Sequence, residues 1–180
     1  MNSRYVIAPA GPADAAELAQ VHVRSWRETY PELLPAGFLE RMSSDAHARR
    51  WAWRLARGGE ITLAAEGPEG LAGYVSAERA RRPANAVAEG EITTLYVLQR
   101  AQGLGLGRAL FEAAARALAA QGATSLIVWV LSENRAARAF YQRLGGVEAG
   151  EGIEQVGGLQ IASVAYRWSD LGTWLAGRAG

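Results

Sequence analysis

The feature that most constrains this chain is a run of β-branched and aromatic residues that leads through closely spaced glycines into an alanine-rich segment. Residues 92–98, Ile-Thr-Thr-Leu-Tyr-Val-Leu, have the composition of a half-buried strand. Gly103, Gly105 and Gly107 come next, and the alanine-rich residues that follow them are typical of a helix. The stretch therefore predicts a strand, a glycine turn and a helix in direct succession.

A turn of this kind at the start of a helix is suited to binding an anion. The first backbone N–H groups of a helix have no intrahelical partners, and the aligned peptide dipoles make that end partly positive. Glycine removes the Cβ atoms that would hold a phosphate away from those groups, and it allows positive φ angles. We therefore expect a phosphate-bearing ligand at residues 102–108.

The spacing of the glycines does not fit two common phosphate-binding motifs. A Rossmann fingerprint that starts at Gly103 needs a third glycine where Arg108 stands, and a P-loop needs a Gly-Lys-Ser/Thr ending that is absent. The pattern that fits is Gln-x-x-Gly-x-Gly, formed by Gln102, Gly105 and Gly107. It resembles the acetyl-CoA binding signature of the GCN5-related N-acetyltransferase (GNAT) superfamily, in which the pyrophosphate of coenzyme A lies on this turn.

A second match to the same family lies downstream. Residues 134–145, Asn-Arg-Ala-Ala-Arg-Ala-Phe-Tyr-Gln-Arg-Leu-Gly, resemble its segment Asn-x-x-Ala-x-x-Phe-Tyr-x-x-x-Gly. The resemblance implies that Asn134 contacts the cofactor and that the Tyr141 hydroxyl lies near its sulfur. The alternative is that Asn134 caps a helix and that both aromatic residues fill the core; for Phe140 we expect the core. One departure from the family is Gln99-Arg100-Ala101, where many relatives have a proline after the strand.

The resemblance also implies how the reaction proceeds. An alkyl ammonium has a pKa of about 10 and no lone pair for attack, so transfer to an amine needs a base. Glu91 stands where many relatives place a glutamate, and burial would raise its pKa towards the useful range. The alternative for Glu91 is a solvent-exposed charge at a strand end, and Glu89 is a nearby second candidate. Tyr141 is the implied general acid, which gives a proton to the departing thiolate.

Backbone groups of the strand complete the implied cofactor site. A preorganised N–H can stabilise the negative charge that grows on the acetyl oxygen, and the resemblance implies a donor in residues 95–98, with Val97 as the candidate. Relatives splay this strand from the next one, which leaves its backbone to pair with the pantetheine arm. The residues that we expect to bind acetyl-CoA are Leu95, Tyr96, Val97, Gln102, Gly103, Leu104, Gly105, Leu106, Gly107, Arg108 and Asn134.

The acceptor site leaves a weaker signal. Residues 25–31, Ser-Trp-Arg-Glu-Thr-Tyr-Pro, look like a segment of one broad subset of the family, in which the first two helices wall the acceptor site. The substrate-binding candidates are therefore Trp26, Arg27 and Tyr30. As alternatives, Trp26 would only pack in the core and Arg27 would be a solvated surface charge. His22 and His47 are expected to be helix-surface or core residues. The weaker candidates are Trp51, Trp53, Arg81 and Arg82.

Taken in order, the chain predicts an α/β fold. Strands are expected at residues 5–8, 61–65, 71–77, 92–98, 125–131, around 147 and at 159–168, and helices at about 14–30, 38–55, 106–121 and 134–144. We expect residues 78–90 to form a surface loop, residues 150–158 a connection, and the last residues to fray. The resemblance implies the GNAT fold, a mixed and mostly antiparallel central sheet of about seven strands flanked by about four helices.

Length and composition limit the remaining possibilities. We expect 180 residues, 49% of them hydrophobic, to form a single N-acetyltransferase domain with a core at about 4–169 and a C-terminal tail at 170–180. The 19 basic and 18 acidic residues give no broad positive field for nucleic acid or anionic membrane. The lack of cysteine and the two distant histidines argue against a thiol nucleophile and a metal site. The chain has no signal-like start and no apolar run near the ~20 residues that cross a bilayer, so we expect a cytoplasmic protein.

These observations together predict an acetyl-CoA-dependent N-acetyltransferase that needs no metal. It would transfer the acetyl group directly to a primary amine of a small molecule or peptide, in a ternary complex. The alternatives are an acyltransferase that uses a longer acyl-CoA, and a non-catalytic CoA-binding sensor or interaction module. The presence of both Glu91 and Tyr141 argues against the sensor. Relatives are often dimers, so the resemblance is compatible with a homodimer.

Overall fold

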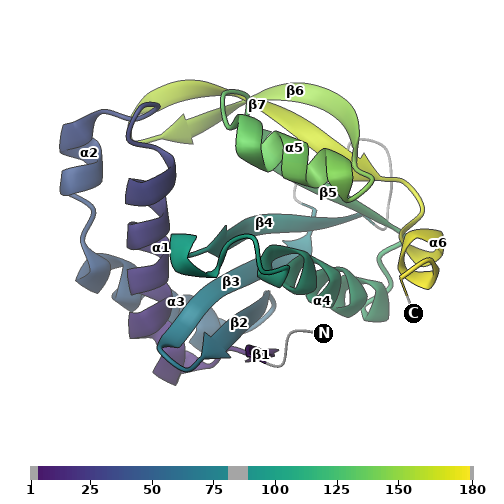
Figure 1. Cartoon of the computed structure of the whole chain (residues 1–180), viewed down its shortest axis with the longest axis horizontal. Helices are drawn as coiled ribbons and strands as arrows, with labels where there is room; N and C mark the ends of the chain where they lie inside the picture. Colours follow the sequence, from purple (N-terminus) through teal and green to yellow (C-terminus); the bar gives the residue numbers. More distant parts are fainter. Residues whose placement is uncertain (1–3, 81–88, 179–180) are drawn as a thin grey trace. The chain divides into compact units, whose positions relative to one another are not determined.

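The computed structural model describes residues 4–80 and 89–178 (Figure 1). The chain divides into two compact units. The first unit comprises residues 4–77 and 94–114, and the second comprises 78–80, 89–93 and 115–178. Each unit is described by itself below. Arg81 and Arg82, two of the weaker acceptor candidates, lie outside the described residues.

The strands are hydrogen-bonded in the order β1-β2-β3-β4-β5-β7-β6. Their bounds are Val6–Pro9 for β1, Ile61–Gly67 for β2, Gly70–Arg79 for β3, Glu89–Val97 for β4, Ser125–Leu131 for β5, Val147–Val156 for β6 and Leu159–Trp168 for β7. β4 pairs with β5 in parallel, whereas the β1–β2, β2–β3, β5–β7 and β6–β7 pairs are antiparallel. The prediction of a mixed, mostly antiparallel sheet of about seven strands in an α/β fold is confirmed.

Six α-helices lie in the described part of the chain, where the sequence predicted about four. They are α1 (Ala15–Thr29), α2 (Ala36–Glu40), α3 (Ser44–Arg57), α4 (Leu106–Ala120), α5 (Arg135–Arg143) and α6 (Leu171–Ala176), with short 3-10 turns η1 (Pro12–Asp14) and η2 (Gln99–Ala101). The helix predicted at 38–55 is in fact two helices. The chain leaves the helical conformation between them, and the Ser43 hydroxyl then accepts a hydrogen bond from the Ala46 N–H at 3.3 Å to cap α3.

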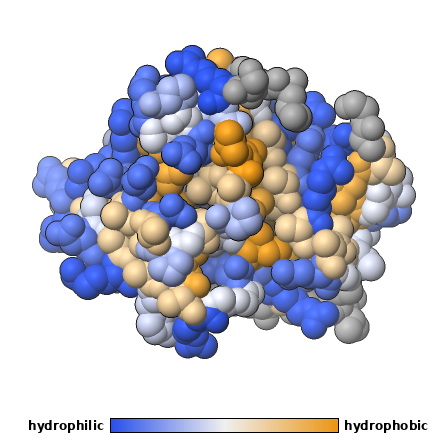
Figure 2. Space-filling model, turned by 90° about the horizontal axis from the view of Figure 1, so that it is seen from below, coloured by the Kyte–Doolittle hydropathy of each residue, from blue (hydrophilic) through white to orange (hydrophobic). Residues whose placement is uncertain are grey.

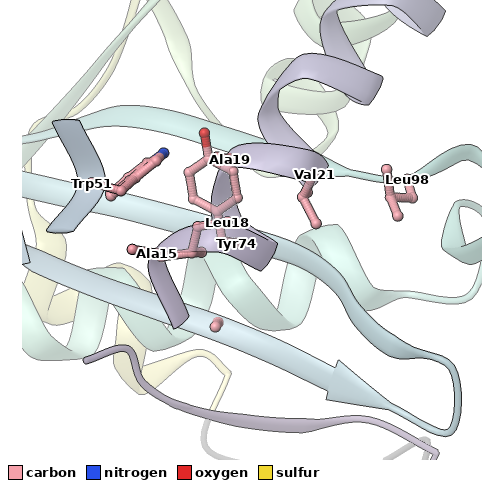
Figure 3. Packing of buried hydrophobic residues seen from close by; sticks show 8 residues of the cluster. Ala15, Leu18, Ala19, Val21, Trp51, Tyr74 and Leu98 are labelled. Carbon is pink, nitrogen blue, oxygen red and sulfur yellow. The ribbon is translucent and has the colours of Figure 1, made fainter. Parts of the chain in front are cut away.

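The core of the first unit lies where α1 and α3 pack together against the strands (Figure 1). Leu18 and Ala19 of α1 are fully buried, and full burial of a leucine side chain is worth about 1.5–3 kcal/mol. Figure 3 shows the indole of Trp51 beside the phenol ring of Tyr74; the two rings meet edge-on at 5.2 Å between centroids. Tyr74 has no exposed surface, so its hydroxyl must find its partner inside the protein.

The second unit buries β5 and β7 beneath α5. Tyr141 of α5 packs against Tyr166 and Trp168 of β7, with ring centroids 6.1 and 6.3 Å apart. Beyond β7 the chain forms α6, whereas residues 179–180, the last of those expected to fray, lie outside the described residues. The Leu144 carbonyl accepts hydrogen bonds from the indole N–H groups of Trp168 at 3.1 Å and Trp174 at 2.7 Å. These bonds fix α6 to the loop that follows α5.

Two loop predictions in the second unit are also corrected. The glycine-rich stretch expected to connect two strands belongs mostly to β6, which bulges between Glu148 and Gly150. A Cβ at Gly152 would lie 2.7 Å from the Trp129 ring, so this glycine permits a close approach and does not mark a turn. In the expected loop at 78–90, β3 continues to Arg79 and β4 begins at Glu89.

The exterior mixes hydrophilic residues with smaller apolar patches on the face shown in Figure 2. Among the residues that the structure describes, none of the helices has the length and apolar character of a membrane-spanning segment.

Candidate functional site

The glycine turn precedes α4 in the first unit. Gly103 and Gly105 have φ angles of 74° and 81°, in the left-handed region that favours glycine, which confirms the conformational part of the prediction. A Cβ added at either position would meet no atom within 4 Å. Backbone conformation is therefore what requires glycine here, and the surface in front of both residues is open.

The turn leads directly into the first turn of α4. The Gly105 carbonyl accepts a hydrogen bond from the Ala109 N–H at 3.0 Å, the first bond of the helical ladder. Leu106 is 4% exposed and anchors this end of the helix in the core. The N–H groups of the first helical turn, which includes Gly107 and Arg108, have no acceptor within the helix. The arrangement can bind an anion through backbone N–H groups and the helix dipole.

Gln102 ties the turn to the end of β4. Its side-chain amide donates a hydrogen bond to the Val97 carbonyl at 2.9 Å. The segment before it, which lacks the family's proline, is held by other contacts. The Gln99 N–H donates to a Glu28 carboxylate oxygen at 3.1 Å, and the Arg100 guanidinium donates to the Leu71 carbonyl at 3.3 Å. These bonds join the segment to α1 and to β3.

The end of β4 is closely apposed to β3. The Leu98 N–H donates to the Ala72 carbonyl at 2.9 Å, and a Cβ on Gly73 would lie 2.7 Å from the Tyr96 carbonyl oxygen. The register of β4 with β5 covers Glu89–Ile92, which belong to the second unit.

The two candidate bases lie in the second unit and differ in their surroundings. Glu89 is 2% exposed; its carboxylate lies 2.8 Å from Arg167 Nε, close enough for an ion pair although the N–H is poorly aligned for a hydrogen bond. The Ser125 hydroxyl donates to the same carboxylate at 3.5 Å. Glu91 is partly buried and lies opposite Ile127 in the register. It is therefore more accessible than Glu89, and it is not the fully exposed charge of the alternative interpretation.

Asn134 and Tyr141 belong to α5, also in the second unit. The Asn134 side-chain oxygen accepts a hydrogen bond from the Ala137 N–H at 3.1 Å, so the capping contact of the alternative interpretation is present. Tyr141 is 6% exposed and has its ring enclosed by those of β7. Phe140, expected in the core, is only partly buried. The expectation for Phe140 was wrong in degree: its ring meets that of Tyr141 edge-on at 5.2 Å but keeps part of its surface exposed.

The three acceptor candidates lie in the first unit and have different contacts. Trp26 is partly buried and meets the ring of Tyr30 edge-on at 5.2 Å. Arg27 donates to the carbonyls of Leu39 at 3.2 Å and Met42 at 3.1 Å, and so holds the connection between α2 and α3. Arg27 is therefore bound to the fold, whereas Trp26 and Tyr30 lie together in an aromatic cluster.

Sequence reasoning missed one member of that cluster, His22. The His22 Nδ1 lies 2.7 Å from the Tyr74 hydroxyl, and the His22 ring lies 5.4 Å from those of both Trp26 and Tyr96. A signal was present in the sequence, because His22, Trp26 and Tyr30 recur at intervals of four and share one face of a helix.

Burial sets the charge state of this cluster. It lowers the pKa of His22 from 6.5 to about 3, with further contributions from His47, Arg54 and Arg50. Burial, followed by Arg50, also lowers the pKa of His47. Burial raises the pKa of the Tyr96 hydroxyl well above 10, and the neighbouring Tyr30 adds to that shift. At neutral pH the cluster therefore consists of uncharged imidazoles and hydroxyls.

The structure thus distributes the expected site residues over both units. The turn, the end of β4 and the three acceptor candidates belong to the first unit, whereas Glu91, Asn134 and Tyr141 belong to the second. Across residues 4–80 and 89–178, no group of three or more metal-ligating side chains is placed to hold a metal ion.

This strand order, with a glycine turn between β4 and α4, is the arrangement expected of the GNAT fold. The acetyltransferase (GNAT) family model matches residues 18–146. An uncharacterized N-acetyltransferase of Bacillus subtilis, YuaI, is 30% identical over 88% of this chain and 89% of its own length. The chain belongs to the acetyltransferase (GNAT) family. As predicted, its class is that of the acetyl-CoA-dependent N-acetyltransferases.

Solved structures share the fold. A GCN5-related N-acetyltransferase from Rhodopseudomonas palustris is 25% identical with a TM-score of 0.70, and the match covers 92% of this chain and 95% of that one. The PaiA N-acetyltransferase from Thermoplasma acidophilum, crystallised in complex with coenzyme A, is 17% identical with a TM-score of 0.65. That match covers 89% of this chain and 97% of the other, so the fold extends over nearly the whole chain.

Proposed function

We propose that this protein transfers the acetyl group of acetyl-CoA directly to a primary amine of a small molecule or peptide, in a ternary complex. The observation that carries the proposal is the open glycine turn at the start of α4, where Gly103 and Gly105 adopt left-handed conformations with no atom in front of them. Family membership and the coenzyme A bound to the PaiA relative support it.

The backbone groups of the turn and of the first turn of α4 would bind the diphosphate, because their N–H groups have no helical acceptor. Gln102 would fix the turn through its bond to Val97, and the backbone of residues 95–97 would pair with the pantetheine arm. When bound, acetyl-CoA supplies the activated thioester. The assigned residues are Leu95, Tyr96, Val97, Gln102, Gly103, Leu104, Gly105, Leu106, Gly107, Arg108 and Asn134.

Two side chains of the second unit are assigned the proton transfers. Glu91 would accept the proton of the acceptor amine, and its partial burial supports that role because removal from water makes a carboxylate a stronger base. Tyr141 would give a proton to the leaving thiolate; its enclosed ring supports a fixed orientation of the hydroxyl. Trp26, Arg27 and Tyr30 would form the acceptor side, where Arg27 acts by holding the α2–α3 connection.

The decisive experiment replaces Gly105 by glutamate and measures acetyl-CoA affinity by calorimetry. Bulk and negative charge at the turn should weaken binding by about tenfold or more. Gly122→Glu is the matched control, because Gly122 has a φ of 89° and equally open space but follows the other end of α4. Both variants carry the same backbone strain of about 1–2 kcal/mol. Unchanged affinity in Gly105→Glu would overturn the assignment.

Turnover is tested separately by following thiol release with a panel of amines and peptides. An acetylated product, identified by mass spectrometry, is the expected result. Tight acetyl-CoA binding without turnover of any acceptor would favour the non-catalytic sensor, whereas turnover with longer acyl-CoA alone would favour the acyltransferase alternative.

A further inference from the structure

The first unit contains an aromatic cluster that the proposed function uses only in part. We define it as His22 and Trp26 of α1, Tyr30 at the end of that helix, Phe38 of α2 and Tyr96 of β4. Trp26 is its centre, with ring centroids 5.2 Å from Tyr30, 5.4 Å from His22, 6.2 Å from Phe38 and 6.5 Å from Tyr96.

The cluster lies at the surface of its unit and not in the deep core. Tyr30 is 7% exposed, whereas His22, Trp26, Phe38 and Tyr96 are each only partly buried. Tyr74, which supports His22 from beneath, is fully buried. Four adjacent rings therefore keep part of their surface available, which is the composition of a site that binds an apolar body.

The charged side chains that act on His22 are cationic. Arg50 and Arg54 of α3 both disfavour protonation of His22, as does the neighbouring His47. Arg54 also forms an ion pair with Glu60, while Arg50 is exposed. The other titratable groups that face His22 are the hydroxyls of Tyr74 and Tyr96, which stay protonated at neutral pH.

We propose that the aromatic cluster selects the acceptor, and that the acceptor is a monoamine with an aromatic or aliphatic body in preference to a diamine or polyamine. This inference rests on the proposed function, which places Trp26 and Tyr30 beside the acceptor. The rings bury the apolar body, and Arg50 and Arg54 repel a second ammonium.

Aromatic rings can also attract a cation, but a cation already lies beside these rings. The Arg54 guanidinium is 4.5 Å from the centroid of the Trp51 ring, and Trp51 meets Tyr74, the hydrogen-bond partner of His22, edge-on at 5.2 Å. A second ammonium at the cluster would therefore meet this positive charge. The reacting amine does not, because it attacks in its uncharged form, which these surroundings favour.

Matched acceptor pairs test the inference. Benzylamine and 1,4-bis(aminomethyl)benzene share one ring, and hexylamine and 1,6-diaminohexane share one chain; each pair differs by one ammonium group. With saturating acetyl-CoA, we expect kcat/KM to be about tenfold higher for the monoamine of each pair, the effect of one uncompensated charge near the arginines. Equal or higher kcat/KM for the diamines would overturn the inference and leave the proposed function intact.

The remaining outcomes also decide between the two proposals. Turnover of peptide or amino-acid acceptors with none of the four amines would overturn the acceptor class alone. Lack of turnover with every acceptor would contradict the proposed function itself.

An arginine substitution locates the source of the selectivity. Arg50→Gln should raise kcat/KM for the diamines several-fold and change that for the monoamines much less, so the diamine-to-monoamine ratio should rise. Arg49→Gln is the matched control, because Arg49 is an exposed neighbour on α3 that is not among the groups acting on His22. A general loss of stability would lower kcat/KM for both amines of a pair by the same factor. An unchanged diamine-to-monoamine ratio in Arg50→Gln would therefore refute the role of this arginine.

Discussion

Replacing His22 by phenylalanine isolates one buried hydrogen bond of the aromatic cluster. The variant keeps a ring at the position but loses the Nδ1 that lies 2.7 Å from the Tyr74 hydroxyl. Because Tyr74 is fully buried, its hydroxyl then lacks this partner in a medium of low polarity, at a cost of about 1–3 kcal/mol. Tyr74→Phe should lower the free energy of unfolding by a similar amount. The double variant removes both partners of the hydrogen bond, so its loss of stability should be smaller than the sum of the two single losses by at least about 1 kcal/mol.

The same substitution removes a titratable group whose pKa differs between the folded and the unfolded protein. The pKa of His22 is about 3 in the folded state and 6.5 as its ordinary value, so both states are neutral above pH 6.5. Between pH 6.5 and 3 the unfolded chain binds a proton that the folded chain does not, and the free energy of unfolding falls as the pH drops. The His22 contribution to this loss is about 2 kcal/mol at pH 5. His22→Phe should lack it.

Urea unfolding at pH 7.5 and pH 5.0, followed by circular dichroism, measures both effects. The wild-type protein should lose about 2 kcal/mol more than His22→Phe between the two pH values. His47→Phe is the control, because it retains the imidazole of His22 and most of the pH dependence that this residue causes. An equal pH dependence in wild type and His22→Phe, or strictly additive costs in the double variant, would refute the reasoning.

Four further substitutions follow from the second unit and the β3–β4 contact. Tyr141→Phe should lower kcat more than it weakens acetyl-CoA binding, and full activity across the pH range would remove its role as an acid. Glu89→Gln should destabilise the fold by about 3 kcal/mol in urea, because it leaves Arg167 without its buried counter-charge, whereas Glu91→Gln should chiefly lower kcat. Gly73→Ala should lower stability by about 1–3 kcal/mol, because its Cβ would lie 2.7 Å from a β4 carbonyl oxygen; an unchanged urea midpoint would contradict this.

The parts of the fold that local sequence encodes could be predicted. The glycine turn was found because its strand, its glycines and its helix are contiguous, and Gly103 and Gly105 do adopt the positive φ angles that their positions suggested. The open sheet followed from strand-forming runs and from the family resemblance. Even so, the break between α2 and α3 was missed, since the apolar spacing continues across Ser43 and only its cap reveals the new helix.

The parts that depend on distant contacts could not be predicted. Gly152 reads as a loop residue until Trp129, on another strand, is seen to occupy the space a Cβ would need. His22 looks like an ordinary helix residue until Tyr74, 52 positions later, is placed within hydrogen-bond distance. Arg27 likewise resembles a solvated charge until the carbonyls at the end of α2 are brought to its guanidinium.

The carbonyl of Leu144 has a practical consequence for anyone who shortens or tags this chain. Besides the two indole N–H groups, it accepts a hydrogen bond from the Arg178 guanidinium at 3.2 Å, so three donors from the last eleven described residues converge on one oxygen. Trimming after Trp168 would remove two of those donors and also the edge-on contact between the Trp168 and Trp174 rings, whose centroids are 6.3 Å apart. An affinity tag is therefore better fused to the amino end, where it does not disturb the hydrogen bonds to the Leu144 carbonyl.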